Sequence, residues 1–374
     1  MFYKKLLLLM ISVSCVMFLV GLIGCKATTS TSSSTKTLTS TSPATTSITL
    51  SLKGPTTTPV GPIAYAITTG PDDNLWFTEE KSNVICKISP TTGSITEYKV
   101  PNSVTPYGIT PGPFGITTGP DDNLWFTETD GSTSPFVNEI GEISPTTGSI
   151  TEYNIPTASA GPYHITSGPD GNLWFVEYDG NKIGKISPST GKITEYDIPG
   201  AKPYDYPNDI TAGPDGNLWF TERHGNLIGK ISPATGVIAE YPLPTTDSNP
   251  GDITAGGDGN LWFTEWNKIG KISPVTGNIT EYTLPDADAD PGPFGIAAGP
   301  DGNLWFTESY TDKIGKISPK TGNVIEYNIP DTNVEPADIT VGPDGNLWFT
   351  QSNENKIGKI SPATGKITEY PLAN

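Results

Sequence analysis

Gly342-Pro343-Asp344-Gly345-Asn346-Leu347-Trp348-Phe349-Thr350 is one copy of a phrase that the chain repeats seven times. The segments at 356–361 and 367–370, Lys-Ile-Gly-Lys-Ile-Ser and Ile-Thr-Glu-Tyr, complete this copy. The marker tryptophans are spaced by 49, 49, 45, 43, 43 and 43 residues, at Trp76, Trp125, Trp174, Trp219, Trp262, Trp305 and Trp348. A period in the low forties with strand-like units is typical of the blades of a β-propeller.

Each copy predicts four short strands, which make one blade. In the last copy these strands cover 338–341, 346–350, 356–361 and 366–370. The pair Asp344-Gly345 predicts a tight hairpin, because glycine adopts positive φ without steric cost. The Leu-Trp-Phe run is apolar on both faces of its strand, as expected between two neighbouring blades. We therefore predict an all-β fold, a seven-bladed β-propeller with four antiparallel strands per blade, over residues 61–374.

Closure of the predicted ring needs no borrowed blade, since seven Trp-Phe strands match seven closing strands. Residues 48–52, Ile-Thr-Leu-Ser-Leu, also have the pattern of a fourth strand. This segment either pairs with the last blade as a latch or belongs to an ordinary linker.

The first residues have the pattern of a targeting segment. Lys4 and Lys5 precede an apolar stretch from 6 to 23, and Gly24-Cys25 follows it. This ending resembles the lipobox of secreted lipoproteins, which predicts a signal peptide over 1–24 and a diacylated Cys25 that anchors the protein in a membrane. The alternative is an uncleaved transmembrane helix, because 18 apolar residues are close to the minimum that spans a bilayer. Both interpretations place the propeller outside the cytoplasm, at a cell surface or in a periplasm.

Residues 25–60 consist mostly of Ser, Thr, Ala, Lys and Pro after the cysteine, which predicts a disordered tether. The net charge of −18 argues against nucleic acid as a partner. Cys86 is the only cysteine of the propeller, which excludes a disulfide framework there. It takes the glycine position of the Lys-Ile-Gly-Lys-Ile segment, and we expect a packed thiol.

The blade sequence resembles that of a known family. The phrase Gly-Pro-Asp-Gly-Asn-Leu-Trp-Phe-Thr-Glu, followed by Lys-Ile-Gly-Lys-Ile and Ile-Thr-Glu-Tyr, is similar to the virginiamycin B lyase (streptogramin lyase) family of seven-bladed propellers. The resemblance covers residues 61–374. It implies a metal-assisted elimination that opens streptogramin B antibiotics at their ester bond, with a histidine as general base and Mg²⁺ near glutamates.

The residues that the resemblance implies for this chemistry are mostly different here. The family's base lies in a Glu-Pro-His-Gly-Ile segment of the last blade, where this chain has Ala337 after Glu335 and Pro336. The family's second metal-binding glutamate matches Gln351 or Ser352, and its substrate-binding histidine matches Phe294. Alanine cannot abstract a proton. Glu335 and His164 remain weak catalytic candidates, and His164 and His224 are the chain's two histidines.

A different constellation comes from aligning the residue before the first isoleucine of each blade. These seven residues are Ala66, Gly115, His164, Asp209, Asp252, Gly295 and Asp338. If the first strand is innermost, the three carboxylates and the imidazole converge near the axis of the ring, where they predict a Ca²⁺ or Mg²⁺ site. The alternative is that each aspartate accepts hydrogen bonds from nearby backbone N–H groups. A second repeated set, the glutamates after Trp-Phe-Thr, is expected to serve local hydrogen bonding within each blade.

The loops between blades, and those between second and third strands, vary most and are expected on one face. Aromatic residues stand in or beside them, and such residues stack on sugars or apolar ligands. The predicted ligand-binding residues are Tyr163, Tyr204, Tyr206, Trp266 and Phe294. The alternative is ordinary loop packing.

Three functions follow from these patterns. The first is a diverged, lipid-anchored member of the lyase-like propellers that binds a glycan, peptide or small molecule. The second is a metal-dependent carbon–oxygen lyase with a relocated base. The third is a structural protein of the cell envelope. The absent histidines argue against the second, and the first is the function that we predict.

Overall fold

The structure is a computed structural model that describes residues 63–79, 81–101, 112–129, 138–200, 202, 205–285 and 287–372. The segments expected to form the signal peptide, the tether and the latch therefore lie outside the described residues, as do Cys25 and Tyr204. Within the described part of the chain, no helix has the length and apolar character needed to cross a bilayer.

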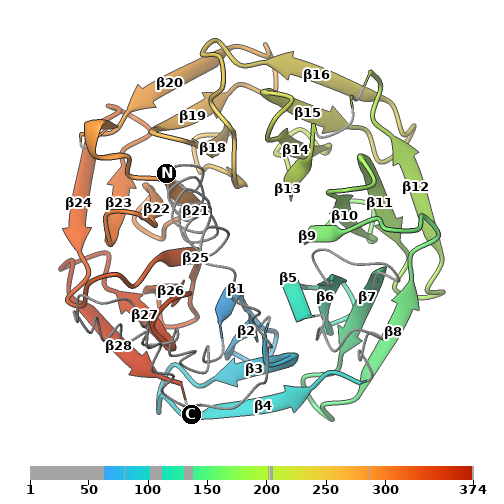
Figure 1. The fold of residues 1–374 in the computed structure, drawn as a ribbon, viewed down its shortest axis with the longest axis horizontal. Helices are drawn as coiled ribbons and strands as arrows, with labels where there is room; N and C mark the ends of the chain where they lie inside the picture. Colours follow the sequence, from blue (N-terminus) through green and yellow to red (C-terminus); the bar gives the residue numbers. More distant parts are fainter. Residues whose placement is uncertain are drawn as a thin grey trace, which may run out of the picture. The chain divides into compact units, whose positions relative to one another are not determined.

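The described strands form seven separate sheets, each of four antiparallel strands in sequence order. Figure 1 shows these sheets arranged as a ring about a common axis, with the first strand of each sheet innermost and the fourth outermost. The predicted seven-bladed β-propeller is confirmed. We number the blades 1 to 7 along the chain.

The inner two strands of each blade carry the ring positions and the Trp-Phe run. The innermost strands are β1 (Ala64–Thr69), β5 (Gly112–Thr118), β9 (Pro162–Ser167), β13 (Pro207–Ala212), β17 (Ile253–Ala255), β21 (Pro293–Ala298) and β25 (Pro336–Val341). The second strands are β2 (Leu75–Glu79), β6 (Leu124–Thr129), β10 (Leu173–Glu177), β14 (Leu218–Glu222), β18 (Leu261–Glu265), β22 (Leu304–Glu308) and β26 (Leu347–Gln351).

The outer two strands complete each blade. The third strands are β3 (Val84–Ile88), β7 (Asn138–Ile143), β11 (Lys182–Ile186), β15 (Leu227–Ile231), β19 (Lys268–Ile272), β23 (Lys313–Ile317) and β27 (Lys356–Ile360). The fourth strands are β4 (Ile95–Lys99), β8 (Ile150–Asn154), β12 (Ile193–Asp197), β16 (Ile238–Pro242), β20 (Ile279–Thr283), β24 (Val324–Asn328) and β28 (Ile367–Pro371). A 3₁₀ turn, η1 (Ala287–Ala289), lies between blades 5 and 6.

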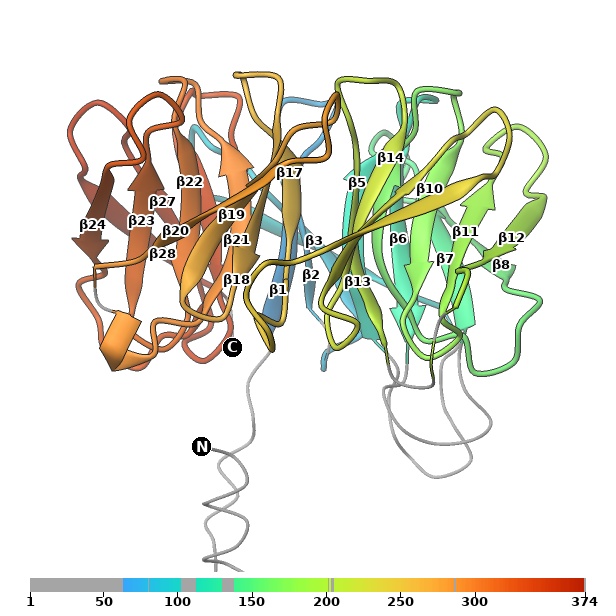
Figure 2. The ribbon, with the colours of Figure 1, turned by 90° about the horizontal axis from the view of Figure 1, so that it is seen from above.

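Antiparallel order within a blade sorts the connections onto two faces. The turns between the first and second strands and between the third and fourth strands lie at one face. The described linkers from blade to blade, including η1, lie at the opposite face together with the described loops between second and third strands (Figure 2). We call this opposite face the linker face. The variable loops therefore share one face, as the repeat pattern predicted.

The hydrophobic core lies between neighbouring blades. In the second strand of blade 1, Trp76 packs against Leu124 and Phe126 of blade 2, while Phe77 packs against Trp348 of blade 7. All of these side chains are fully buried. Because the strand alternates its side chains between two faces, one Leu-Trp-Phe run supplies both interfaces of its blade.

The turn before each tryptophan is fixed by that tryptophan. In blade 4, Trp219 Nε1 donates to Asp215 Oδ1 at 3.0 Å, and the same bond recurs in the other blades. Burial acts to raise the pKa of Asp215, but the hydrogen bonds from Trp219 and Asn217 outweigh it and lower the pKa. The repeated Asp-Gly-Asn-Leu-Trp spacing thus places a carboxylate beside the indole.

The glycine of Lys-Ile-Gly-Lys-Ile lies under the phenylalanine of the second strand. Gly184 pairs with Phe175, and a Cβ at Gly184 would lie 2.1 Å from Phe175 Cζ. Cys86 takes this position in blade 1 and is fully buried with a free thiol. Burial and the neighbouring Glu79 raise the pKa of that thiol, so it is protonated and packed, as expected from its position.

Candidate functional site

A β-bulge near the start of the innermost strand brings two consecutive residues to the centre of the linker face. In blade 4 Pro207 pairs with Glu222 and Ile210 with Phe220, so Asn208 and Asp209 lie within the register shift. The same shift occurs in blades 1, 2, 3, 6 and 7. A bulge re-aims side chains, and bulges are frequent beside functional sites.

Two layers of side chains result, one per bulge residue. The first layer, nearer the linker face, comprises Tyr65, Phe114, Tyr163, Asn208, Gly251, Phe294 and Ala337. The second layer comprises Ala66, Gly115, His164, Asp209, Asp252, Gly295 and Asp338. The sequence analysis aligned only the second of these layers.

The aromatic residues of the first layer contact one another across the axis. The ring of Tyr65 lies 3.9 Å from that of Phe114 and 5.7 Å from that of Phe294, between centroids. Phe114 and Tyr163 are 3.8 Å apart. Residues from blades 1, 2, 3 and 6 therefore form one aromatic cluster, and two of its rings, Phe114 and Tyr163, also contact His164 of the second layer.

Two aspartates of the second layer join neighbouring blades. Asp209 Oδ2 accepts the N–H of Ile253 in blade 5 at 2.8 Å, and its Oδ1 accepts the N–H of Ile210 at 2.7 Å. Asp338 makes the equivalent pair of hydrogen bonds. It accepts the N–H of Ile67 in blade 1 and the N–H of Ile339 in its own blade. For these two residues the structure supports the backbone-bonding interpretation that the sequence left open.

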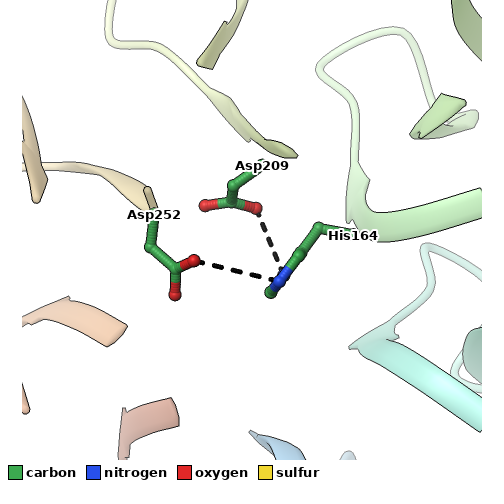
Figure 3. Close-up of side chains that lie close together, drawn as sticks. All are labelled: His164, Asp209 and Asp252. Atoms are coloured by element: carbon green, nitrogen blue, oxygen red, sulfur yellow. Dashed lines mark ion pairs between the residues drawn. The ribbon is translucent and has the colours of Figure 1, made fainter. Parts of the chain in front are cut away.

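Asp252 and His164 differ from these two residues. His164 Nδ1 lies 3.4 Å from Asp209 Oδ1, and His164 Nε2 lies 3.8 Å from Asp252 Oδ1, as Figure 3 shows. One ligand atom from each residue lies within 4.8 Å of the others. Among the described residues, the buried atoms Asp252 Oδ1 and His164 Nε2 have no hydrogen-bond partner.

Burial controls the protonation of this cluster. It lowers the pKa of His164 to about 4, against the opposite effect of Asp338, so the imidazole is neutral at pH 7. Burial raises the pKa of Asp209 to about 7 and that of Asp338 to about 6. Burial, together with the charges of Asp209 and Asp338, raises the pKa of Asp252 well above its usual range.

A cavity of about 40 Å³ opens at the linker face where blades 4, 5 and 6 meet. Its lining comprises Asn208, Arg223, Asn249, Gly251, Trp266, Gly292, Pro293, Phe294, Ser309 and Tyr310. Arg223 is the chain's only arginine, and within the described part of the chain it forms no ion pair. Trp266 and Tyr310 are 38% and 60% exposed beside it. The cavity therefore offers a cation and aromatic surfaces to solvent.

The predicted ligand-binding aromatics fall into two groups. Trp266 and Phe294 line the cavity. Tyr163 instead joins the first layer, where it stacks on Tyr178 at 5.0 Å, and Tyr178 stacks on Tyr206 at 4.2 Å. Three further lining residues were not predicted from the sequence: Arg223, Asn208 and Tyr310. Arg223 could have been noticed because it is the only arginine in a chain of net charge −18.

The positions that correspond to the family's base and metal ligands are occupied as follows. Ala337 is 5% exposed and belongs to the first layer. The carboxylate of Glu335 is exposed, and its backbone carbonyl accepts bonds from Ser352 N–H and Oγ. Gln351 is fully buried and donates to Glu369 Oε1 at 2.9 Å. Only Glu335 therefore presents a carboxylate here.

The repeated glutamates of the second strands lie inside the blades, away from the cavity. Glu177, Glu222 and Glu265 are at most 1% exposed. Burial raises their pKa values to about 8, about 8 and about 7, and the fourth-strand glutamates of the same blades add to the effect. These residues lie beside the fourth-strand glutamates of their own blades, and local hydrogen bonding for them stays a prediction from their repetition.

The fold and this linker-face site define a class of seven-bladed propellers, and comparison with known proteins identifies the family. The model of the virginiamycin B lyase family matches residues 113–291 and 267–374. The chain therefore belongs to the virginiamycin B lyase family.

Three solved structures illustrate this relationship, each 40% identical to the chain. Streptogramin B lyase matches with a TM-score of 0.69 over 79% of this chain and 92% of that one. Selenomethionine-substituted virginiamycin B lyase from Staphylococcus aureus matches with a TM-score of 0.69 over 79% of this chain and 94% of that one. A catalytically inactive histidine-to-alanine variant of that enzyme, with Quinupristin, matches with a TM-score of 0.70 over 81% of this chain and 96% of that one.

More distant structures show the fold alone. The extracellular domain of a one-component system from B. thetaiotaomicron is 16% identical, with a TM-score of 0.63 over 82% of this chain and 41% of that one. A comparison with curated protein sequences gives no match.

Proposed function

We propose that this chain is a non-catalytic member of the virginiamycin B lyase family that binds a small ligand at the linker-face cavity. Ala337 takes the position at which the family resemblance requires the general base. A buried methyl group has no site for a proton. His164 does not replace it, because its imidazole is buried against the rings of Phe114 and Tyr163, at 5.9 and 5.5 Å between centroids.

The magnesium ion that the family resemblance implies does not fit the described residues at that place. Mg²⁺ prefers an octahedral set of oxygen ligands that includes carboxylates. Glu335 offers one exposed carboxylate, while Gln351 is an amide that bonds to Glu369 inside the blade. We therefore derive no elimination step through a metal ion here.

Arg223 carries the argument for the ligand's chemistry. It is half-buried beside the cavity, and its positive charge acts to lower the pKa values of Tyr163 and Asp252, against the larger effect of burial. A guanidinium without a carboxylate partner favours an anion that it can bind through two parallel hydrogen bonds. Trp266 and Phe294 add flat apolar surfaces.

The expected ligand is therefore a carboxylate attached to a ring, either aromatic or a sugar. The cavity has room for the carboxylate, and the ring with any further part of the ligand would lie across the exposed faces of Trp266 and Tyr310. A glycan with uronate residues and an aromatic acid share this chemistry.

The first experiment incubates the full chain with quinupristin and Mg²⁺ and follows the antibiotic by mass spectrometry. We expect the ring of quinupristin to stay closed. A linearised product that forms with this chain, and not with buffer alone, would show a lyase with a relocated base.

The second experiment titrates the chain with benzoate and with glucuronate while tryptophan fluorescence is followed. At least one probe should bind, and Arg223→Gln and Trp266→Ala should each weaken binding about 10-fold or more. Lys320→Gln, which removes a positive charge from an exposed turn at the opposite face, is the matched control. Equal affinity in all variants, or no binding of either probe, contradicts this function and favours a structural role in the envelope.

The protein acts outside the cytoplasm, anchored through a diacylated Cys25. The support is the sequence pattern of residues 1–25 and the long polar segment that follows it. Metabolic labelling with a palmitate analogue should label the chain, and Cys25→Ser should abolish the label and release the protein from the membrane fraction. Membrane retention of Cys25→Ser without label would instead indicate an uncleaved helix.

A further inference from the structure

Blade 3 lacks a contact that joins other neighbouring blades. In blade 4, Thr221 Oγ1 accepts the N–H of Asp209 in its own bulge and donates to the carbonyl of Gly251 in blade 5. Equivalent threonines do the same in blades 1, 2, 5, 6 and 7. We call this pair of hydrogen bonds the threonine clamp. In blade 3 the position is Val176, which has no hydroxyl, so the junction with blade 4 has no threonine clamp.

His164 lies at the junction where the clamp is missing. It comes from the bulge of blade 3, Asp209 comes from the bulge of blade 4, and Asp252 directly precedes β17 at the equivalent position of blade 5. The three side chains point toward one another from three consecutive blades (Figure 3). A group that bound all three would connect the three blades directly.

The unsatisfied atoms of this cluster indicate what such a group is. Asp252 is 5% exposed and His164 is 8% exposed. Asp252 Oδ1 and His164 Nε2 face each other at 3.8 Å, and neither has a hydrogen-bond partner. A buried polar atom without a partner destabilises the fold because it has lost its hydrogen bonds to water. The contacts of the described residues therefore leave this pair unexplained.

We propose that His164, Asp209 and Asp252 bind a divalent first-row transition metal ion such as Zn²⁺ or Mn²⁺, which pins blade 3 to blades 4 and 5. The donor set is one imidazole nitrogen and two carboxylate oxygens. An imidazole ligand favours these ions over Mg²⁺ and Ca²⁺, which prefer oxygen ligands. The proposal thus replaces the Ca²⁺ or Mg²⁺ expected from sequence, and it is independent of the linker-face cavity.

The geometry is close to that of a bound ion. Bonds of about 2.0–2.2 Å to nitrogen and oxygen place adjacent ligand atoms about 3–3.5 Å apart. One ligand atom from each residue lies within 4.8 Å of the other two. The two shortest approaches use different nitrogens of the imidazole, since Nδ1 lies 3.4 Å from Asp209 Oδ1 and Nε2 lies 3.8 Å from Asp252 Oδ1. An ion binds one of these two nitrogens, so a rotation of the imidazole or of a carboxylate completes the site.

The surroundings hold the ligands in place. The N–H groups of Ile210 and Ile253 orient the carboxylate of Asp209, as outer-shell hydrogen bonds do at metal sites. Asp338 adds a further negative charge near the imidazole. A divalent cation would offset the mutual repulsion of the three buried carboxylates, and this repulsion contributes to the raised pKa of Asp252.

The test uses the full chain, stripped of metal with EDTA and dialysed. Thermal melting with Zn²⁺, Mn²⁺, Mg²⁺ and Ca²⁺ measures binding by stabilisation, and calorimetry gives the stoichiometry. We expect one Zn²⁺ or Mn²⁺ per chain and a higher Tm. His164→Ala and Asp252→Asn should weaken binding about 100-fold or more, and His224→Ala, which changes the only other histidine, should leave it unchanged.

A measurement that needs no variant accompanies the titration. Co²⁺ added to the stripped wild-type chain should give visible absorption bands typical of a site with a nitrogen ligand, and Zn²⁺ should remove them. Absence of these bands, a Tm that rises only with Mg²⁺ or Ca²⁺, or equal loss of binding in His224→Ala would each overturn the proposal.

Discussion

The hydroxyl of Thr350 donates a 2.7 Å hydrogen bond to the backbone carbonyl of Tyr65, 285 positions earlier in the chain. This contact closes the ring, since Thr350 belongs to blade 7 and Tyr65 to blade 1. Packing of Trp348 against Leu75 and Phe77 seals the same junction. The first and last blades are therefore joined by the same side-chain contacts as other neighbouring blades, and each keeps four strands of its own.

The missing clamp of blade 3 gives the first prediction. Val176→Thr should raise the free energy of unfolding by about 1 kcal/mol, because a threonine there can accept the N–H of His164 and donate to the carbonyl of Asn208. The reverse change in blade 6, Thr307→Val, should lower it by about 1–3 kcal/mol, because two buried backbone groups lose their partner. Urea unfolding of both variants measures the difference, and equal effects of the two changes would contradict the role of the clamp.

The buried glutamates give the second prediction. The pKa values of Glu177 and Glu222 are raised from 4.5 to about 8 in the folded state. The folded protein therefore binds more protons than the unfolded chain between about pH 4.5 and 8, and stability should fall as the pH rises through this window. His164 has the opposite effect, because its pKa is lowered from 6.5 to about 4 in the folded state. Its contribution to stability is therefore lost as the pH falls from 6.5 to 4. Melting temperatures should be higher at pH 5–6 than at pH 8.

Blade 7 provides the control for this pH dependence. It carries Gln351 where the other blades have glutamate, and the Gln351 amide donates to Glu369. Glu222→Gln should therefore be accommodated, raise the free energy of unfolding at pH 8 by about 1–3 kcal/mol and reduce the slope against pH. An unchanged slope in this variant would assign the pH dependence to other groups.

The sequence predicted the repeating fold well because each repeated residue has a local role that its neighbours fix. The strand expected at 338–341 begins earlier, at Pro336, since the bulge allows Pro336 to pair with Gln351 across the register shift. A bulge inserts residues without any change in the repeat, so its position could not be read from the pattern.

The candidate site was harder to predict than the fold. Alignment of the repeats placed His164, Asp209 and Asp252 at one level, and the structure brings these three together. It could not show that Asp338 and Asp209 bind backbone N–H groups while Asp252 does not. Arg223 was missed because it lies in a variable loop, where no repeat predicts the direction of a side chain.

The contact between Gly184 and Phe175 gives the third prediction. A Cβ at Gly184 would lie 2.1 Å from Phe175 Cζ, so Gly184→Ala must displace the ring in a packed core. We expect a loss of about 1–3 kcal/mol in the free energy of unfolding, which is typical of overpacking. The double variant Gly184→Ala with Phe175→Leu should recover part of the loss. Unchanged stability of the single variant would show that Phe175 can move freely.

Blade 2 gives the last prediction, because its third strand has an acidic residue opposite the glutamate that ends the Leu-Trp-Phe-Thr-Glu run. In blade 5 the equivalent residue is Lys268, whose ammonium lies 2.7 Å from Glu281 Oε2. Blade 2 has Glu139 there, and one carboxylate oxygen each of Glu128, Glu139 and Glu152 lie within 4.8 Å of one another. Burial raises the pKa of Glu152, and the charge of Glu139 adds to this. Glu139→Lys should therefore replace a repulsion with an ion pair.

The expected gain is about 0.5–1 kcal/mol at pH 8, which is the range of a partly exposed pair. It should shrink in 1 M salt, where screening shortens the reach of charges to about 3 Å. Glu139→Gln separates the two contributions, since it removes the negative charge without adding a positive one and should give a smaller gain. Urea unfolding at pH 8 in low and high salt compares the three proteins. A loss of stability in Glu139→Lys would mean that the three glutamates are held together by something other than the protein, such as a bound cation.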